Sequence, residues 1–174
     1  METFLNPEKV LSQIEVRRDM VAAEFGCGSG GFALPLAKKI KDGLVYGLDI
    51  QQAPLNVLKS RTLFEKLVNV RVIRCDLEKP RGSTLPSNSL DLVLIPNVLF
   101  QAEDKIAIMT EANRVLKNGG KAVVIDWLPG VLQGPGKGRI SAEEVKKIAE
   151  SLGLKPEKEI QAGVYHYGLV FVKP

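Results

Sequence analysis

The stretch EFGCGSGG, Glu24 to Gly31, decides the fold. It follows an apolar run and precedes an apolar pattern of helical spacing, so it joins a strand to a helix. Glycines packed this densely let a backbone come close to another group, either a ligand or only the helix that follows. Gly26, Gly28 and Gly31 also satisfy the G-x-G-x-x-G pattern of dinucleotide-binding loops. Alone, the stretch leaves open a dinucleotide, a phosphate, another nucleoside or a simple tight turn.

The segments around this stretch alternate between apolar runs and helical stripes. Near-continuous apolar runs such as LVYGLDI and LDLVLI are typical of strands buried on both faces of a parallel sheet. Helical stripes lie before the first run and between the later ones, and Asn6-Pro7 and Ser141 with Glu144 are typical of helix starts. The predicted strands are Met20–Phe25, Leu44–Ile50, Val70–Cys75, Leu90–Pro96 and Lys121–Trp127.

The C-terminal segment has a different pattern. Two strand-like runs, Leu154–Ile160 and Val164–Val172, flank Gln161-Ala162-Gly163, which predicts a hairpin. One of its strands must therefore run antiparallel to the others. The predicted fold is α/β, a single doubly wound, Rossmann-like sandwich with a mostly parallel seven-stranded sheet closed by a C-terminal antiparallel hairpin.

The length of 174 residues fits one domain, residues 1–174. Residues 1–18 are predicted to form a leading helix that could serve as a lid. Loops are predicted at Ala53-Pro54, at Glu78–Ser89 and at Leu128–Gly138.

Composition excludes several classes of protein. Two cysteines and one histidine are too few for a zinc site, so no metal is expected. No run approaches the roughly 18 apolar residues of a membrane span, and the N-terminus has no apolar run of signal-peptide length. We expect a cytoplasmic protein. The net charge of +4 comes from interspersed acids and bases, without an arginine-rich stripe typical of nucleic-acid binding.

Three acids lie at the ends of three successive predicted strands: Glu24, Asp49 and Asp76. Carboxyl ends of parallel strands form the ligand-binding rim of a doubly wound sheet. Asp49 lies about 20 residues beyond the glycines, the spacing at which an acid accepts ribose hydroxyls. Glu24 would repel a pyrophosphate but suits a ligand with an ammonium group. The three acids together indicate a cationic nucleoside.

The chain resembles the class I S-adenosylmethionine-dependent methyltransferases over nearly its whole length. EFGCGSG is similar to the family's E/D-x-G-x-G-x-G motif, and SLDLVLIPNVLF (89–100) to its fourth-strand motif. Arg114 with LKNGGKAVVIDW (116–127) is similar to the R-x-L-k-p-G-G turn and fifth strand. Within the family, the chain is most similar to small methylases related to ubiquinone and menaquinone biosynthesis.

The resemblance implies S-adenosyl-L-methionine as cofactor and methyl transfer as activity. It places Asp49 at the ribose with Ile50 packing on the adenine, and Asp76 and Leu77 at the adenine edge. Pro96 and Asn97 border the methyl group, and Asn97 is a candidate catalytic residue. The resemblance also implies that the methionine end of the cofactor is bound by the motif residues Glu24, Phe25, Gly26, Gly28 and Gly30.

The rival interpretation is a nicotinamide-dependent oxidoreductase, since the glycines fit both cofactors. The acid at Glu24 and the absence of a Tyr-x-x-x-Lys pair favour the methyltransferase. The fourth-strand motif reads IPNVLF and lacks the Asn-Pro-Pro-Tyr of nucleic-acid amino methyltransferases. A small-molecule acceptor is therefore expected, and a protein or RNA acceptor, or a protein that binds the cofactor without transferring methyl, stays open.

His166 is the one candidate general base. It lies at the start of the last strand and, if that strand is antiparallel, on the same rim as the other strands' carboxyl ends. Tyr165 and Tyr167 should point to the opposite face. Trp127 could wall the acceptor site. Phe4 and Leu5 with the loop Leu128–Gly138 could form a small lid, and the basic loop end, Lys137 and Arg139, could attract an anionic acceptor or be a solvated turn.

Overall fold

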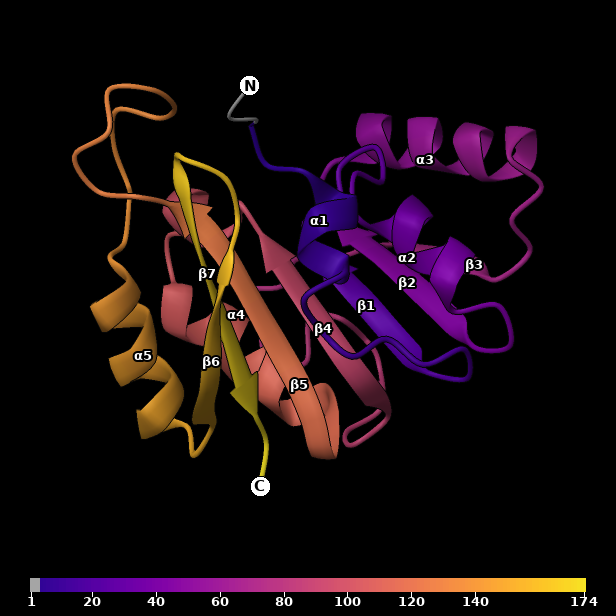
Figure 1. The fold of residues 1–174 in the computed structure, drawn as a ribbon. Coiled ribbons are helices and arrows are strands. Elements are labelled where there is room, and N and C mark those ends of the chain that lie inside the picture. The colour runs from indigo at the N-terminus through magenta and orange to yellow at the C-terminus, as the bar shows by residue number, and fades with distance from the viewer. Residues whose placement is uncertain (1–3) are drawn as a thin grey trace.

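The computed structural model describes residues 4–174, so residues 1–3 of the predicted leading segment lie outside the described part. A seven-stranded sheet forms the centre of the molecule, with helices on both faces (Figure 1). The elements in chain order are α1 (Pro7–Leu11), β1 (Val21–Phe25), α2 (Ala33–Lys39), β2 (Leu44–Asp49), α3 (Gln52–Phe64), β3 (Val70–Arg74), β4 (Leu90–Pro96), the 3-10 helix η1 (Leu99–Gln101), α4 (Lys105–Val115), β5 (Leu116–Trp127), α5 (Ala142–Ser151), β6 (Lys155–Gln161) and β7 (His166–Val172).

The sheet order is β3-β2-β1-β4-β5-β7-β6. Strands β1 to β5 pair in parallel, and the chain crosses from β3 at the edge of the sheet back to β4 beside β1, so the strand order reverses between β1 and β4. β7 inserts antiparallel between β5 and β6, so its first residue, His166, pairs with Trp127 at the carboxyl end of β5. The predicted fold class, with its terminal antiparallel hairpin, is confirmed.

Each face of the sheet has its own core. On one face, α1, α2 and α3 pack their buried side chains, such as Leu11, Leu34 and Leu58, against the sheet. On the other face, α4 and α5 bury Met109 and Val145. This two-sided cover explains why the central strands read as continuous apolar runs. Among residues 4–174, no helix has both the length and the apolarity to cross a membrane.

Local capping chemistry sets the helix ends as predicted. The Asn6 side chain accepts a hydrogen bond from the Lys9 N–H at 3.1 Å, and Pro7 occupies the first position of α1. Ser141 and Glu144 form a reciprocal capping box at the start of α5. Gly153, with φ +82°, follows the end of that helix.

Three predicted boundaries are wrong. The leading helix, expected over residues 1–18, covers only Pro7–Leu11 within the described residues, because the chain turns after Leu11 to enter β1. Ala53 and Pro54, expected in a loop, lie in the first turn of α3, where a proline is tolerated because the N–H groups of that turn have no helical partner. β5 begins at Leu116 rather than Lys121: Leu116 already pairs with Leu90, and a register shift then absorbs the glycines that indicated a turn. β4 spans Leu90–Pro96 as predicted, and the ends of the remaining strands agree with the predictions to within two residues.

Candidate active site

A cavity of about 190 Å³ opens at the carboxyl ends of β1, β2 and β3. Among the residues predicted to hold the cofactor, five line it together: Gly26, Asp49, Ile50, Asp76 and Leu77. The parallel order of the three strands brings their ends to one rim, as the sequence predicted. The cavity is smaller than the about 300 Å³ of a typical ligand site, so it accommodates part of a larger ligand.

Asp49 ties the glycine loop to the end of β2. Its Oδ2 accepts a hydrogen bond from the Gly28 N–H at 2.8 Å, and its Oδ1 accepts one from the Gln51 N–H at 2.9 Å. Each oxygen has a further lone pair, so the carboxylate can accept from a ligand as well.

Asp76 faces the same cavity from the end of β3. Its Oδ1 accepts from the Glu78 N–H at 3.0 Å, which orients the carboxylate at the cavity wall. Leu77 is buried and Ile50 is largely exposed at this rim. Apolar side chains beside carboxylate acceptors suit a flat ring that carries amino and hydroxyl groups.

Glu24 does not line the cavity. Its side chain is only 2% exposed, and its two oxygens accept hydrogen bonds from the Ala33 N–H at 2.6 Å and the Phe32 N–H at 3.4 Å. It therefore caps the start of α2 from inside the loop. Burial raises the pKa of Glu24 to about 8, although the two backbone donors act in the opposite direction. Its direct contact with a ligand stays a prediction.

The three motif glycines have different surroundings. A Cβ at Gly26 would lie 2.5 Å from Val98 Cγ2, and one at Gly30 would lie 2.5 Å from Leu58 Cδ1. At Gly28 no atom lies within 4 Å of that position, although φ is +51°. Gly26 and Gly30 therefore serve the packing of the loop, while Gly28 leaves its backbone open to an approaching group.

The remaining predicted cofactor residues lie beside the cavity. Phe25 is fully buried in the core, and Pro96 is buried at the end of β4. Asn97 has φ +56°, in the left-handed region that favours glycine, and its N–H donates to the Ile125 carbonyl at 2.8 Å. Its Oδ1 is buried and has no hydrogen-bond partner. A buried acceptor needs a hydrogen-bond partner, which a bound ligand or water can supply here.

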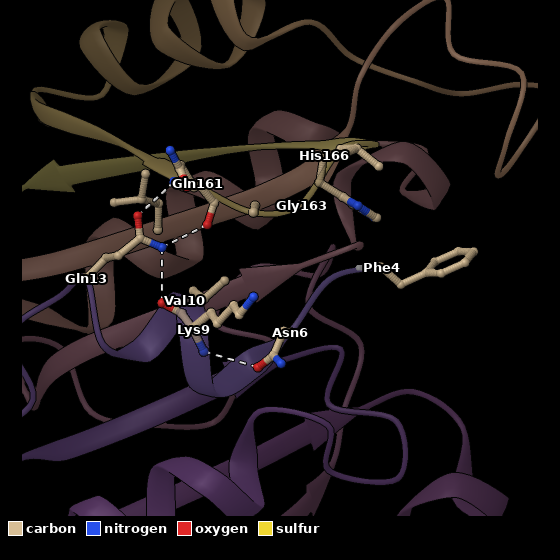
Figure 2. A pocket seen from close by; sticks show the side chains of 11 residues that line it. Phe4, Asn6, Lys9, Val10, Gln13, Gln161, Gly163 and His166 are labelled. Carbon is tan, nitrogen blue, oxygen red and sulfur yellow. Dashed lines mark hydrogen bonds between the residues drawn. The ribbon is translucent and has the colours of Figure 1, made fainter. Parts of the chain in front are cut away.

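His166 lines a second, larger cavity of about 550 Å³, away from the five residues above. Figure 2 shows its ring in the space between the β6–β7 hairpin and the N-terminal segment that carries Phe4 and Asn6. Gln13 joins the two walls, because its Nε2 donates to the Gln161 carbonyl at 2.8 Å and its Oε1 accepts from the Gln161 N–H at 2.9 Å.

The imidazole of His166 is buried, and neither ring nitrogen has a partner. Burial lowers its pKa, so the ring is neutral at neutral pH and has a nitrogen free to accept a proton. Its ring centroid lies 4.1 Å from that of Trp127. Tyr167 packs in the opposite core and donates to the Ile140 carbonyl at 3.1 Å, as the strand alternation predicted. Tyr165 precedes β7, and its ring centroid lies 5.5 Å from that of Phe4, which lines the His166 cavity, so strand alternation does not separate Tyr165 from that cavity.

The loop after β5 covers Trp127. A Cβ at Gly134 would clash with the indole, so only glycine lets the loop pass this close to the ring. Arg139 lies 5.9 Å from the ring centroid and donates to four loop carbonyls: Leu128, Val131, Gln133 and Pro135. Arg139 is half-buried and its donors hold the loop together, so it has a structural role that the sequence did not predict, and its attraction of an anionic acceptor stays a prediction.

Several residues at the rim were not predicted. Val98, Gln101 and Ala102 follow β4 directly and line the first cavity, so the strand-end rule that found Asp49 could have included them. The other additions are Gln51, Cys75, Glu78 and Ile108. Asp126 is a fourth acid at a strand end. It accepts from the Phe100 N–H at 3.1 Å and the Trp127 N–H at 2.7 Å, and burial raises its pKa to about 6.

Comparison with known proteins decides between the two cofactor classes. The family described as "Methyltransferase domain" matches residues 23–124, more than half of the chain, including the glycine loop and all three acids. The chain belongs to the class I S-adenosylmethionine-dependent methyltransferases. The family uses S-adenosyl-L-methionine as methyl donor, and the nicotinamide interpretation is not supported.

Individual proteins that are similar to this chain agree with the family assignment. The demethylmenaquinone methyltransferase of Staphylococcus aureus is 32% identical over 121 residues, covering 68% of this chain and 48% of that protein. That of Geobacillus kaustophilus is 31% identical over 121 residues, covering 68% and 50%. The chain spans about half the length of these curated relatives. A solved S-adenosylmethionine-dependent methyltransferase from Aquifex aeolicus superimposes with a TM-score of 0.88 at 25% identity, covering 98% of this chain and 91% of that one.

The residues present fit the adenosine part of the cofactor. The first cavity offers carboxylate acceptors from Asp49 and Asp76 and an apolar wall from Ile50 and Leu77. The open backbone at Gly28 adjoins Asp49 and leaves room along the glycine loop for the part that the cavity is too small to enclose.

Proposed function

We propose that the chain transfers the methyl group of S-adenosylmethionine to a small molecule. The observation that carries this proposal is the pair of cavities near the carboxyl rim, one lined by Asp49 and Asp76 and the other by His166. The first suits a nucleoside. The second has about 550 Å³, within the range of small-molecule sites, which favours a metabolite over a protein or RNA acceptor.

On the donor side, Asp49 accepts the ribose hydroxyls and Ile50 packs on the adenine. Asp76 and Leu77 recognise the adenine edge, and Gly26, Gly28 and Gly30 shape the backbone around the methionine end. Pro96 and Asn97 border the methyl group. Glu24 acts by holding the first turn of α2, which fixes the position of the loop. These assignments rest on the family motif and on the positions described above.

The sulfonium of the cofactor supplies an already activated methyl group. The chain therefore has to position the acceptor in line and to remove its proton, rather than to activate the donor. His166 is the residue that accepts this proton, because it is neutral, buried and unpartnered in the acceptor cavity. Trp127 fixes the plane of the imidazole from one side.

The class of acceptor is tested by transfer of a labelled methyl group from S-adenosylmethionine into a cell extract. The extract is then separated into protein, RNA and metabolite fractions. The proposal predicts label in the metabolite fraction. Label confined to protein or RNA contradicts the small-molecule acceptor, and absence of label from every fraction contradicts the transferase activity.

Replacement of His166 by alanine tests the base. We expect His166→Ala to lower turnover by roughly 10²- to 10⁴-fold, the usual contribution of a general base, and to leave the affinity for S-adenosylmethionine unchanged. Turnover of the wild type should fall only at a pH below the ordinary imidazole pKa of 6.5, because burial lowers the pKa of His166 and so delays its protonation. Val164→Ala, which enlarges the same cavity without removing a titratable group, is the matched control. Equal turnover of His166→Ala and wild type would remove His166 from the mechanism.

A further inference from the structure

The net charge of the chain is concentrated in one segment. Residues 51–74, from α3 through β3, contain five basic side chains and one acid, a net charge of +4. The whole chain also has a net charge of +4, so the remaining residues sum to zero. The five basic residues are Lys59, Arg61, Lys66, Arg71 and Arg74, and the acid is Glu65.

The same segment exposes large apolar side chains. Val57 is 49% exposed, Leu63 80%, Phe64 88% and Val68 85%. Leu63, Phe64 and Val68 are consecutive or nearly so, and Val57 lies two helical turns before Phe64. Large apolar side chains that are exposed together are typical of a surface that binds a protein, a membrane or a ligand.

Helical geometry places the buried side chains of α3 on one face and its exposed apolar side chains on the other. Leu55, Leu58 and Thr62 are buried against the sheet and fix the inner face of α3. At 3.6 residues per turn, Val57 and Phe64 fall on the outer face. Figure 1 shows α3 as an outer helix of the molecule, on the side opposite the β6–β7 hairpin.

Cations border this outer face on both sides. By the same geometry, Lys59 lies on one flank of the face and Arg61 on the other. Lys66 and Arg71 lie near Val68, and Arg71 donates to the Val68 carbonyl at 3.1 Å. Within residues 4–174, the side chains of Lys59 and Lys66 make no ion pair or hydrogen bond. We call Val57, Leu63, Phe64 and Val68, with Lys59, Arg61, Lys66 and Arg71, the α3 surface.

The positive charge of the α3 surface helps to decide between three candidate partners: a second copy of the chain, a single nucleic-acid strand and an anionic membrane. In a two-fold dimer the surface would face itself, and two clusters of like charge would oppose each other. A single nucleic-acid strand would need aromatic platforms for its bases, and the surface has one aromatic ring, Phe64. An anionic membrane can bind both kinds of side chain in the α3 surface. The apolar side chains enter the boundary of the acyl chains, and the cations contact the anionic headgroups.

We propose that the α3 surface binds the surface of an anionic lipid membrane. Leu63, Phe64 and Val68 enter the interface, and Lys59 and Lys66 contact the headgroups. No residue of the α3 surface lines either of the two cavities, so the surface can bind a membrane without closing them.

The test is co-sedimentation of the full chain with vesicles of phosphatidylcholine, and with vesicles in which about one third of the lipid is phosphatidylglycerol. We expect binding to the phosphatidylglycerol vesicles only, weakened by salt. Lys59→Glu with Lys66→Glu should reduce the bound fraction more than tenfold. Lys147→Glu with Lys155→Glu, the same charge change on exposed lysines elsewhere, should reduce it far less.

Leu63→Ser with Phe64→Ser separates the apolar contribution from the charge. It should also reduce binding to phosphatidylglycerol vesicles, with an unchanged circular dichroism spectrum as evidence of folding. The proposal is overturned if the wild type does not bind these vesicles, or if both pairs of lysine substitutions weaken binding equally. Binding of a single-stranded oligonucleotide without binding of vesicles would assign the surface to nucleic acid instead.

Discussion

Glu24 lies where the sequence places it, but its side chain makes contacts that the sequence did not predict. Its place before the glycines indicates a carboxyl at the strand end, and the structure has it there. The side chain, however, turns inward to the Phe32 and Ala33 N–H groups, because the first turn of α2 leaves those donors without helical partners. Sequence spacing gives the position of a carboxyl but not the direction in which its side chain points.

Burial of Glu24 predicts a pH-dependent stability. Its folded pKa of about 8 lies above the ordinary value of 4.5, so the folded state retains a proton that the unfolded state releases. The contribution of this proton to stability is therefore full below pH 4.5 and is lost as the pH rises toward 8. Glu24→Gln, which cannot ionise, should gain stability relative to the wild type over this range.

The measurement is urea unfolding of wild type and Glu24→Gln at a series of pH values. At acid pH the variant should be less stable by about 1–3 kcal/mol, since the glutamine amide cannot accept both backbone hydrogen bonds. Glu150→Gln, a change at an exposed glutamate of α5, is the control. A stability difference that does not change with pH would contradict the assignment of a buried, protonated carboxyl.

At the scale of elements, different glycines of the loop have different roles: Gly30 allows close packing, and Gly28 leaves room for a ligand. Gly30→Ala places a methyl group against Leu58 and Leu34 and should destabilise the fold strongly. Gly28→Ala meets no atom and costs only the backbone strain of its positive φ, about 1–2 kcal/mol. It should nevertheless lower the affinity for S-adenosylmethionine, because its new methyl group occupies the open side of the loop.

Gly153→Ala is the matched control for strain. Gly153 also has a positive φ, of +82°, with no atom within 4 Å, and it follows α5 at a distance from the site. Thermal unfolding should show similar losses for Gly28→Ala and Gly153→Ala, while titration with S-adenosylmethionine should distinguish them. Wild-type affinity in Gly28→Ala would show that the open side of this loop faces no ligand.

Elements whose signals are local were predicted well, and those that depend on context were not. The capping box at Ser141 and the alternation that separates His166 from Tyr167 need only neighbouring residues. The loop predicted at Pro54 is wrong, because proline occurs both in loops and in the first turn of a helix, and only the packing of α3 distinguishes the two. The predicted strand is shorter than β5 because Gly119 and Gly120 indicate a turn. In the structure, hydrogen bonds with Lys173 keep both glycines in the sheet.

At the scale of the whole molecule, the order of elements was sufficient to predict the sheet and its ligand-binding rim. Parallel strands with helical connections have few permitted topologies, and Asp49 and Asp76 at strand ends then meet by necessity. The cavity lined by His166 could not be predicted in the same way. Its walls are joined by Gln13 and Gln161, which lie 148 residues apart, and no local pattern reports such a contact.

The central claim is that the chain binds S-adenosylmethionine at the Asp49–Asp76 cavity, and calorimetry tests it most directly. Wild type is titrated with S-adenosylmethionine and with NADH, and Asp49→Ala and the exposed Asp19→Ala are titrated with S-adenosylmethionine. We predict binding of S-adenosylmethionine and not of NADH, a more than tenfold loss of affinity in Asp49→Ala, and no change in Asp19→Ala. Binding of NADH without binding of S-adenosylmethionine would contradict the claim.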